Sequence, residues 1–241
     1  MSQLRILNIG NTHIQVIDSD GPGVFRSAGT FATAEFDTIS NDICGNGIPL
    51  AVSSVVPLLT EKMRTWDALI ISGKMRLPFL SPQMDNTTVG ADRIANAAAL
   101  LNGPLPALSI DFGTAVTFEF VTEQGFFDGG AILPGRTLLR KSLHDYTAQL
   151  PLVPLSVNLP SIPARNTVDA IRAGTDLALI GSVKELTESF RQYAETSSLR
   201  VVACGGDRGF FLNHLKGMED GGDFFTALGI RTLWERTQDA C

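Results

Sequence analysis

Two short turns in this sequence carry residue types that can hold a phosphate group. The segments 8–12 (NIGNT) and 111–115 (DFGTA) each place a glycine between two strand-like stretches. A glycine has no Cβ, so the backbone N–H groups beside it can approach a phosphate closely. Hydroxyl and amide side chains next to each glycine add donors, and Asp111 could hold a cation against the phosphate oxygens. The alternative reading of either copy is a hairpin turn that uses Asn and Gly for their positive φ angles.

The two turns occupy equivalent places in the two halves of the chain. Superposing residue 8 on residue 111 aligns Gly10 with Gly113 and Asn11 with Thr114. The offset of about 100 residues is too long for a solenoid repeat. We therefore expect two related lobes, residues 1–103 and residues 104–241.

Two further motifs could carry chemistry. Gly90–Arg93 (GADR) opens an alanine-rich helical stretch, where Asp92 could act as a general base and Arg93 could clamp an anionic group. An acidic residue that favours the helix dipole is the other reading of Asp92. Gly205–Asp207 lies between a strand and a helix, which suits close approach of an adenine or ribose but also an ordinary turn.

Alternating strand and helix patterns position these motifs and are typical of an α/β fold. The Pro-rich connection 151–163 is too broken for regular structure. The predicted helix 167–195 has apolar residues on more than one side, so it could be buried in the core or at a subunit interface. We expect strands at 4–9, 13–17, 24–30, 50–56, 68–72, 107–111, 116–121, 125–131 and 200–203. We expect helices at 33–43, 58–66, 91–101, 134–147, 167–195, 208–215 and 224–237.

Composition narrows the class of protein. The 241 residues include 25 acidic and 19 basic side chains, and this net negative charge of −6 argues against a nucleic-acid partner. No apolar run is long enough to span a membrane, and the N-terminus enters a strand pattern directly, unlike a signal peptide. Three widely spaced cysteines (Cys44, Cys204 and Cys241) fit neither a disulfide framework nor a Cys-x-x-Cys metal site. We expect a cytoplasmic protein with no membrane contact.

Taken together, the motifs resemble those of the type III pantothenate kinase family, within the actin-like and sugar-kinase superfamily. They span nearly the whole chain in the family's order: NIGNT (8–12), SSVVP (53–57), GADR (90–93), DFGTAVT (111–117), GGAILPG (129–135), NTVDAIRAG (166–174) and CGGD (204–207). The resemblance implies two related lobes of the ribonuclease H-like, actin-like ATPase fold with a cleft between them. It also implies ATP-dependent phosphorylation of pantothenate to 4′-phosphopantothenate, the first step of coenzyme A biosynthesis.

The resemblance further implies site residues, cofactors and a partner. Asp92 would be the catalytic base, Asp111 would bind a monovalent cation (K⁺ or NH₄⁺), and Mg²⁺ would enter with ATP. Thr167 would touch pantothenate across a homodimer interface. The pantothenate site would also include Gly90, Ala91, Asp92 and Arg93. The ATP site would comprise Asn8, Ile9, Gly10, Asn11, Thr12, His13, Ile14, Gln15 and Thr114.

The sequence departs from the family's pattern at two positions. Asn8 stands where an Asp is usual, so a carboxylate that would help to hold Mg²⁺ through water is replaced by a neutral amide. Gln83 stands where a tyrosine is usual, which alters one wall of the substrate pocket. Asn8 motivates a second hypothesis, a weakened or inactive relative that binds nucleotide or pantothenate as a regulatory protein. Gln83 motivates a third, a kinase of this fold acting on another hydroxyl substrate.

Overall fold

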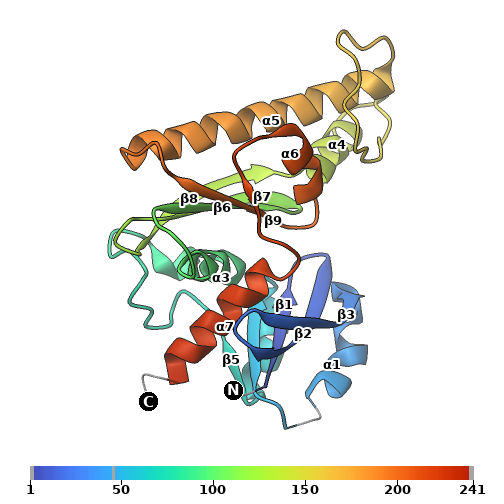
Figure 1. The fold of residues 1–241 in the computed structure, drawn as a ribbon. Coiled ribbons are helices and arrows are strands. Elements are labelled where there is room, and N and C mark those ends of the chain that lie inside the picture. The colour runs from blue at the N-terminus through green and yellow to red at the C-terminus, as the bar shows by residue number, and fades with distance from the viewer. Residues whose placement is uncertain (1–2, 45–46, 239–241) are drawn as a thin grey trace. The chain divides into compact units, whose positions relative to one another are not determined.

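The computed structural model describes residues 3–44 and 47–238 and divides the chain into two compact units (Figure 1). The first unit contains the described residues up to Leu105, residues 123–128 and the chain from Phe224 onward. The second contains residues 106–122 and 129–223. The C-terminal helix therefore returns to the first unit. Met1, Ser2 and Cys241, which entered the sequence-based arguments on the N-terminus and the cysteines, lie outside the described residues.

The first unit is built on a mixed sheet of five strands in the order β3-β2-β1-β4-β5. β1, β2 and β3 form an antiparallel meander, and β1, β4 and β5 run parallel. The strands are β1 (Leu4–Ile9), β2 (His13–Gly21), β3 (Val24–Ala32), β4 (Leu50–Ser54) and β5 (Ala68–Ile70).

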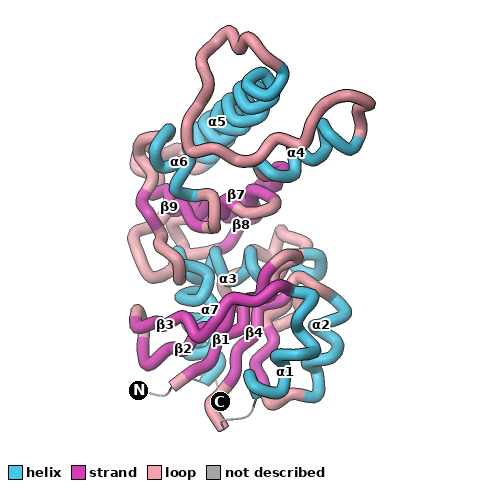
Figure 2. Tube along the Cα trace, turned by 90° about the vertical axis from the view of Figure 1, so that its right-hand side faces the viewer, coloured by secondary structure: helices cyan, strands magenta, loops and turns pink. Residues whose placement is uncertain are grey.

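Helices cover both faces of this first sheet. α1 and α2 lie on one face (Figure 2), where Leu7, Ile9 and Val52 pack against Phe36, the first residue of α1, and Met63, the residue after α2. On the other face lie α3 and α7, which approach each other closely because Gly229 lacks a side chain. A Cβ there would lie 1.7 Å from the carbonyl oxygen of Ala95. The helices are α1 (Phe36–Cys44), α2 (Pro57–Lys62), α3 (Ala91–Leu100) and α7 (Phe225–Gln238), with 3₁₀ turns η1 (Thr33–Glu35), η2 (Met63–Thr65) and η3 (Asn86–Thr88).

The second unit repeats this connectivity strand for strand. Its sheet has the order β10-β9-β6-β7-β8, with β6 antiparallel to β7 and parallel to β9. The equivalent of β1 is therefore β6, and the two candidate phosphate turns follow equivalent central strands. The predicted relation between the two halves of the chain is confirmed. The strands are β6 (Ala107–Phe112), β7 (Ala115–Val121), β8 (Phe127–Pro134), β9 (Arg200–Cys204) and β10 (Glu219–Asp220).

The core of the second unit contains both aromatic and aliphatic side chains. Phe112 at the end of β6 stacks on Phe211 with ring centroids 3.9 Å apart. The long helix α5 (Thr167–Tyr193) contributes Leu179, Ile180 and Val183 to the same core. The same helix leaves other apolar residues exposed, Val168 and Leu177 among them. The helices of this unit are α4 (Arg136–Asp145), α5 (Thr167–Tyr193) and α6 (Arg208–His214).

The predicted order of strands and helices is confirmed, with differences at the ends of elements. The expected helix 58–66 starts at Pro57, which suits the first helical position, and tightens into a 3₁₀ turn at Met63. The two-residue strand β10 was not predicted, because so short a segment carries no periodicity. The Pro-rich connection forms no helix or strand. Within the described parts of the chain, no helix is long and apolar enough to cross a membrane.

Candidate functional site

The first turn joins β1 to β2 and presents polar groups at the sheet's end. Its last strand pair is Ile9 and Ile14, and the N–H of Gly10 donates to the carbonyl of His13 at 2.9 Å. One pair further back, the Nδ2 of Asn8 donates to the Oε1 of Gln15 at 3.2 Å. Residues 11–13 are exposed. Neither Gly10 nor Asn11 has a positive φ, so the reading of this turn as a positive-φ hairpin is wrong.

A residue that sequence reasoning missed fixes this first turn. The Oγ1 of Thr33 donates to the carbonyl of Gly10 at 2.8 Å, and its N–H donates to the carbonyl of Thr12 at 3.0 Å. Thr33 opens η1 just after β3, about twenty residues further along the chain. No local motif marks it, because its role depends on β3 returning beside β2.

The predicted base lies at the start of α3. Gly90 is the N-cap residue, and Asp92 follows in the first turn. Burial raises the pKa of Asp92, and the backbone N–H of Arg93, which donates to its Oδ1 at 2.8 Å, acts in the opposite direction. A Cβ on Gly90 would lie 2.6 Å from Oδ1 of Asp92. The glycine therefore leaves the room that the carboxylate occupies.

Within the first unit, Val55 contacts both the end of β1 and the start of α3. The N–H of Val55 donates to the carbonyl of Ile9 at 3.1 Å, and a Cβ on Gly90 would lie 3.7 Å from the Cγ1 of Val55. The neighbouring Ser53 is in register with Asn8 across β1 and β4. Its buried hydroxyl has no hydrogen-bond partner in the part of the chain that the structure describes. The structure thus brings the turn 8–15 and the GADR segment together.

The second turn, between β6 and β7, is enclosed by backbone from two other segments. Gly205 has a φ of +87°, and a Cβ there would lie 2.3 Å from the Oδ1 of Asp111. The N–H of Gly135 donates to the carbonyl of Thr114 at 2.9 Å, and a Cβ on Gly135 would lie 2.3 Å from the carbonyl oxygen of Gly113. Gly135 of the GGAILPG segment and Gly205 of the CGGD segment therefore pack against this turn from two sides.

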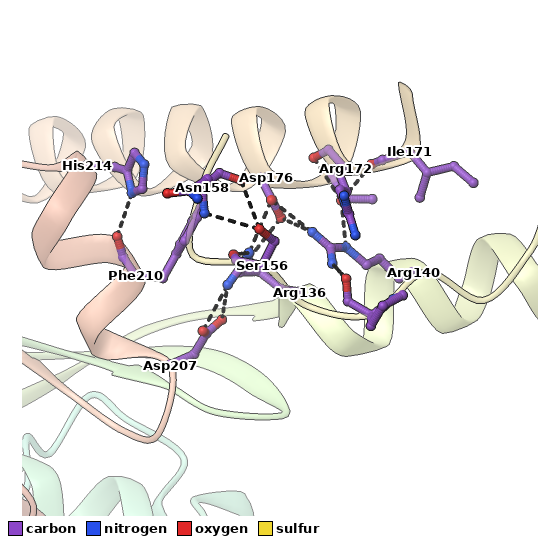
Figure 3. A network of polar contacts seen from close by, with 12 residues as sticks. Arg136, Arg140, Ser156, Asn158, Ile171, Arg172, Asp176, Asp207, Phe210 and His214 are labelled. Atoms are coloured by element: carbon purple, nitrogen blue, oxygen red, sulfur yellow. Dashed lines mark hydrogen bonds and ion pairs between the residues drawn. The ribbon is translucent and has the colours of Figure 1, made fainter. Parts of the chain in front are cut away.

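An ion-pair network includes Arg136 and Asp207, which lie one and two residues after these glycines (Figure 3). Arg136, the residue after Gly135, pairs with Asp176 at 2.9 Å and with Asp207 at 3.0 Å. Arg140 also pairs with Asp176, at 2.8 Å. Desolvation lowers the pKa of Arg140 and raises that of Asp207. Sequence reasoning missed this network, because its members come from α4, α5 and the turn before α6.

Thr167 lies apart from the second turn, at the first position of α5. The side chain of the N-cap residue, Asn166, accepts from the N–H of Asp169 at 2.9 Å. Thr167 lines a cavity of about 770 Å³ between α4 and α5, together with apolar side chains that include Leu143 and Ile171. None of the residues 111–114 lines this cavity.

Oxygen ligands are available for a cation at the second turn. The carboxylate of Asp111 and the hydroxyl of Thr114 are hard donors, the type that K⁺ and Mg²⁺ prefer. Among residues 3–44 and 47–238, no group of three or more His, Cys, Asp or Glu side chains is placed to hold a metal ion. The residues present therefore fit a cation that a single carboxylate holds together with neutral oxygens, rather than a site built from several carboxylates.

Comparison with known proteins points to one family. The sequence profile described as type III pantothenate kinase matches residues 6–189. A type III pantothenate kinase from Geobacter sulfurreducens is 31% identical over 259 aligned positions, which cover 98% of this chain and 100% of the relative.

Solved structures with low sequence identity share the fold. A Campylobacter jejuni protein assigned to the Baf family of transcriptional activators superposes with a TM-score of 0.69 at 16% identity, covering 98% of this chain and 99% of the other. An archaeal actin homologue, Ta0583, superposes with a TM-score of 0.51 at 14% identity, covering 97% and 99%. At such identities the likeness shows the fold alone, an α/β fold of two related units like that of actin.

Proposed function

Because the chain belongs to the type III pantothenate kinase family, we propose that it transfers the γ-phosphate of ATP to the primary hydroxyl of pantothenate. The product is 4′-phosphopantothenate, and the reaction is the first step of coenzyme A biosynthesis. The observation that carries this proposal is the partly buried carboxylate of Asp92 in the first turn of α3, next to Gly90. Phosphoryl transfer needs mostly positioning and charge neutralisation, together with a group that accepts the hydroxyl proton.

Asp92 is the proposed general base. Burial raises its pKa, and a more basic carboxylate is a better proton acceptor as long as it remains ionised at working pH. The N–H of Arg93 donates to its Oδ1, which orients the carboxylate. The other oxygen can then face the hydroxyl group that attacks the γ-phosphate.

The turn 8–15 is the proposed cradle for the ATP phosphates, together with Thr114. Asn11, Thr12 and His13 are exposed and can donate from side chain or backbone. The cross-strand bond uses the Nδ2 of Asn8, so the amide oxygen would be the end that accepts from a water of hydrated Mg²⁺. An amide can accept from that water but adds no charge.

Asp111 is the proposed ligand of the monovalent cation, K⁺ or NH₄⁺, with Thr114 beside it. A bound cation would neutralise part of the charge of the phosphate oxygens. Gly205 and Gly135 support this role, because their backbones hold the strand end and the turn in one arrangement. The Mg²⁺ would come with ATP.

Pantothenate is proposed to lie along Gly90–Arg93, with Thr167 of a second copy of the chain completing the site. The cavity at Thr167 and the exposed apolar side chains nearby, such as Ile162 and Val168, support a homodimer at this face. Arg93 is the cationic group of the GADR segment that can meet the pantothenate carboxylate.

The deciding experiment is a product assay with purified protein, MgATP and pantothenate. We expect ADP and 4′-phosphopantothenate to form in KCl or NH₄Cl and to fall sharply when K⁺ is replaced by Na⁺. Pantetheine and small sugars serve as alternative acceptors, because the exposed Gln83 stands in the loop before α3. No phosphorylation of pantothenate by the dimeric protein in KCl would refute the proposal, and transfer to another acceptor would redirect it.

The second candidate function is a weakened relative that binds nucleotide or pantothenate as a regulatory protein. The neutral Asn8–Gln15 pair at the first turn favours it. Asn8→Asp tests it, since Gln15 can turn its amide to donate to the new carboxylate. A carboxylate would accept from a water of hydrated Mg²⁺ in a charge-assisted hydrogen bond, roughly twice as strong as the neutral one that an amide makes, so we expect about a tenfold rise in kcat/KM for MgATP. A silent parent that this change activates would favour the regulatory role. A parent already as active as the variant would exclude it.

A further inference from the structure

The side chain of Arg136 in the second unit is held by hydrogen bonds from all three nitrogens of its guanidinium group. The Nε and Nη2 of Arg136 donate to the two oxygens of Asp176, at 2.9 and 3.1 Å. Its Nη2 also donates to the carbonyl of Ser156 at 2.6 Å, and its Nη1 reaches both oxygens of Asp207 at 3.0 and 3.3 Å. The guanidinium lies 3.5 Å from the centre of the Phe210 ring. A guanidinium has five donors in a rigid fork, so its orientation is fully fixed.

Stability alone is a poor explanation for such a network. The side chains of Arg136 and Arg140 are 2% and 1% exposed, and that of Asp176 is fully buried. Removing charges from water costs free energy that a buried ion pair often fails to recover. Replacing a buried ion-pair network by apolar residues of similar volume is often neutral or stabilising. The network is better explained by what it positions.

Asp207 is a member of the network that reaches solvent, since its side chain is 23% exposed. The N–H of Asp207 donates to the carbonyl of Phe112 at 2.9 Å. Two residues earlier, Gly205 lies against Asp111 so closely that a Cβ would reach the backbone N of Phe112 at 2.6 Å. The carboxylate that Arg136 grips therefore belongs to a turn lying directly on the end of β6.

The other side of the same strand end is held through the backbone next to Arg136. Gly135 precedes Arg136 and donates its N–H to the carbonyl of Thr114 at 2.9 Å. The contacts close a ring, from Phe112 to Asp207, from Asp207 to Arg136, and from Gly135 back to Thr114. In Figure 3, Arg136 lies between Asp176 on α5 and Asp207 on the turn before α6.

We propose that Arg136 and Asp207 are positioning residues that hold the segment 111–114 in the geometry required for binding a nucleotide phosphate with its cation. The ion pair closes the ring, which keeps the Asp111 carboxylate and the backbone at Gly113 and Thr114 at a fixed spacing. The inference rests on the proposed function for the identity of the ligand, a nucleotide with its cation. It adds two residues to the site and assigns the network a role.

Arg140 supplies a matched control. It shares Asp176 with Arg136, and its remaining donors go to Thr175 and to the carbonyl of Pro154 rather than to Asp207. After either Arg136→Met or Arg140→Met, the remaining arginine still contacts both oxygens of Asp176. The two variants therefore disturb the buried network alike, but only the first releases Asp207.

The experiment measures ADP binding by calorimetry, with Mg²⁺ and without pantothenate, in KCl and in NaCl, alongside Tm. We expect Arg136→Met and Asp207→Asn to weaken ADP binding in KCl by about tenfold, equivalent to about 1.4 kcal/mol, and to shrink the difference between K⁺ and Na⁺. Arg140→Met should lower Tm about as much as Arg136→Met while leaving ADP affinity within roughly twofold.

Equal losses of Tm with unchanged ADP affinity in both arginine variants would overturn the inference, since the network would then be structural only. Asp207→Asn keeps the shape of the side chain, so it decides the question if Arg136→Met fails to fold. A parent that binds no ADP also overturns the inference. A parent that binds ADP with the expected variant effects but does not phosphorylate pantothenate would refute the proposed function and leave this inference standing.

Discussion

The two hairpin turns share a topology but are held in different ways. The first turn is neutral and open, with the Asn8–Gln15 amide pair behind it and a nearest neighbour 3.5 Å from a Cβ placed on Gly10. The second turn carries Asp111 and is walled by the backbones of Gly135 and Gly205. Duplication of a sheet therefore did not duplicate the environment of its central turn.

The difference suggests a division of labour between the turns. An open turn with exposed donors can adjust to a ligand, whereas a turn packed by backbone on two sides is already ordered before binding. The first unit still contributes a carboxylate, but it stands on α3 as Asp92 instead of on β1. The charges that the proposed reaction needs are thus placed on a helix in one unit and on a strand end in the other.

The largest effect should come from removing the carboxylate of the first unit. Asp92→Asn keeps the shape of the side chain but cannot accept a proton, so we expect kcat to fall by about 10²–10⁴-fold. Steady-state kinetics with pantothenate and MgATP measures this. Because burial raises the pKa of Asp92, activity of the parent should be lost, as pH falls, at a higher pH than for an ordinary Asp.

The same variant should gain stability at neutral pH. A raised folded-state pKa means that ionised Asp92 opposes folding, so its favourable contribution is lost as pH rises through that pKa. The Tm of Asp92→Asn should exceed that of the parent at pH 7, and the gap should close in acid. An inactive variant with a lower Tm at neutral pH would indicate a structural role for Asp92 instead.

The next largest effect should be the loss of stability when a Cβ is added beside the second turn, which the first turn should tolerate. Gly205→Ala places a Cβ 2.3 Å from Asp111 at a φ of +87°, which should cost about 3 kcal/mol in overpacking and backbone strain. A chain of this size should lose roughly 10 °C in Tm. Gly10→Ala is the matched change at the first turn, where a Cβ meets only ordinary contact. Its effect on the free energy of unfolding should stay within about 0.5 kcal/mol. Comparable losses of stability in both variants would remove the contrast between the turns.

Much of the fold could be predicted from sequence because its signals are local. Strands β1 and β6 are short apolar runs that end in Gly-containing turns, and α3 follows from its alanine-rich segment opened by Gly90. The relation between the halves could be predicted from the paired turns together with the resemblance of the motifs to a two-lobed family. Asp92 and Asp111 could be proposed as site residues because each stands inside a recognisable motif.

The rest of the site could not be predicted, because its contacts join distant segments. Thr33, which follows β3, donates to Gly10, which follows β1. Arg136 donates to Asp207 at a separation of 71 residues. Ser53 stood in a motif, yet its burial beside Asn8 depends on the register of β1 with β4. Pattern and spacing along one chain carry no information on such pairings.

The smallest effect should come from loosening the first turn. Thr33→Val keeps the side-chain shape and the N–H bond to Thr12 but removes the hydroxyl that donates to the carbonyl of Gly10. The loss of one hydrogen bond is worth about 1 kcal/mol, so KM for ATP should rise about fivefold with kcat nearly unchanged. The exposed Thr30 on β3 offers the matched control, Thr30→Val, which should alter neither quantity. If Thr33→Val instead leaves KM for ATP at the parent's value, the first turn holds its shape without this clamp, and the contrast drawn between an adaptable and an ordered turn fails.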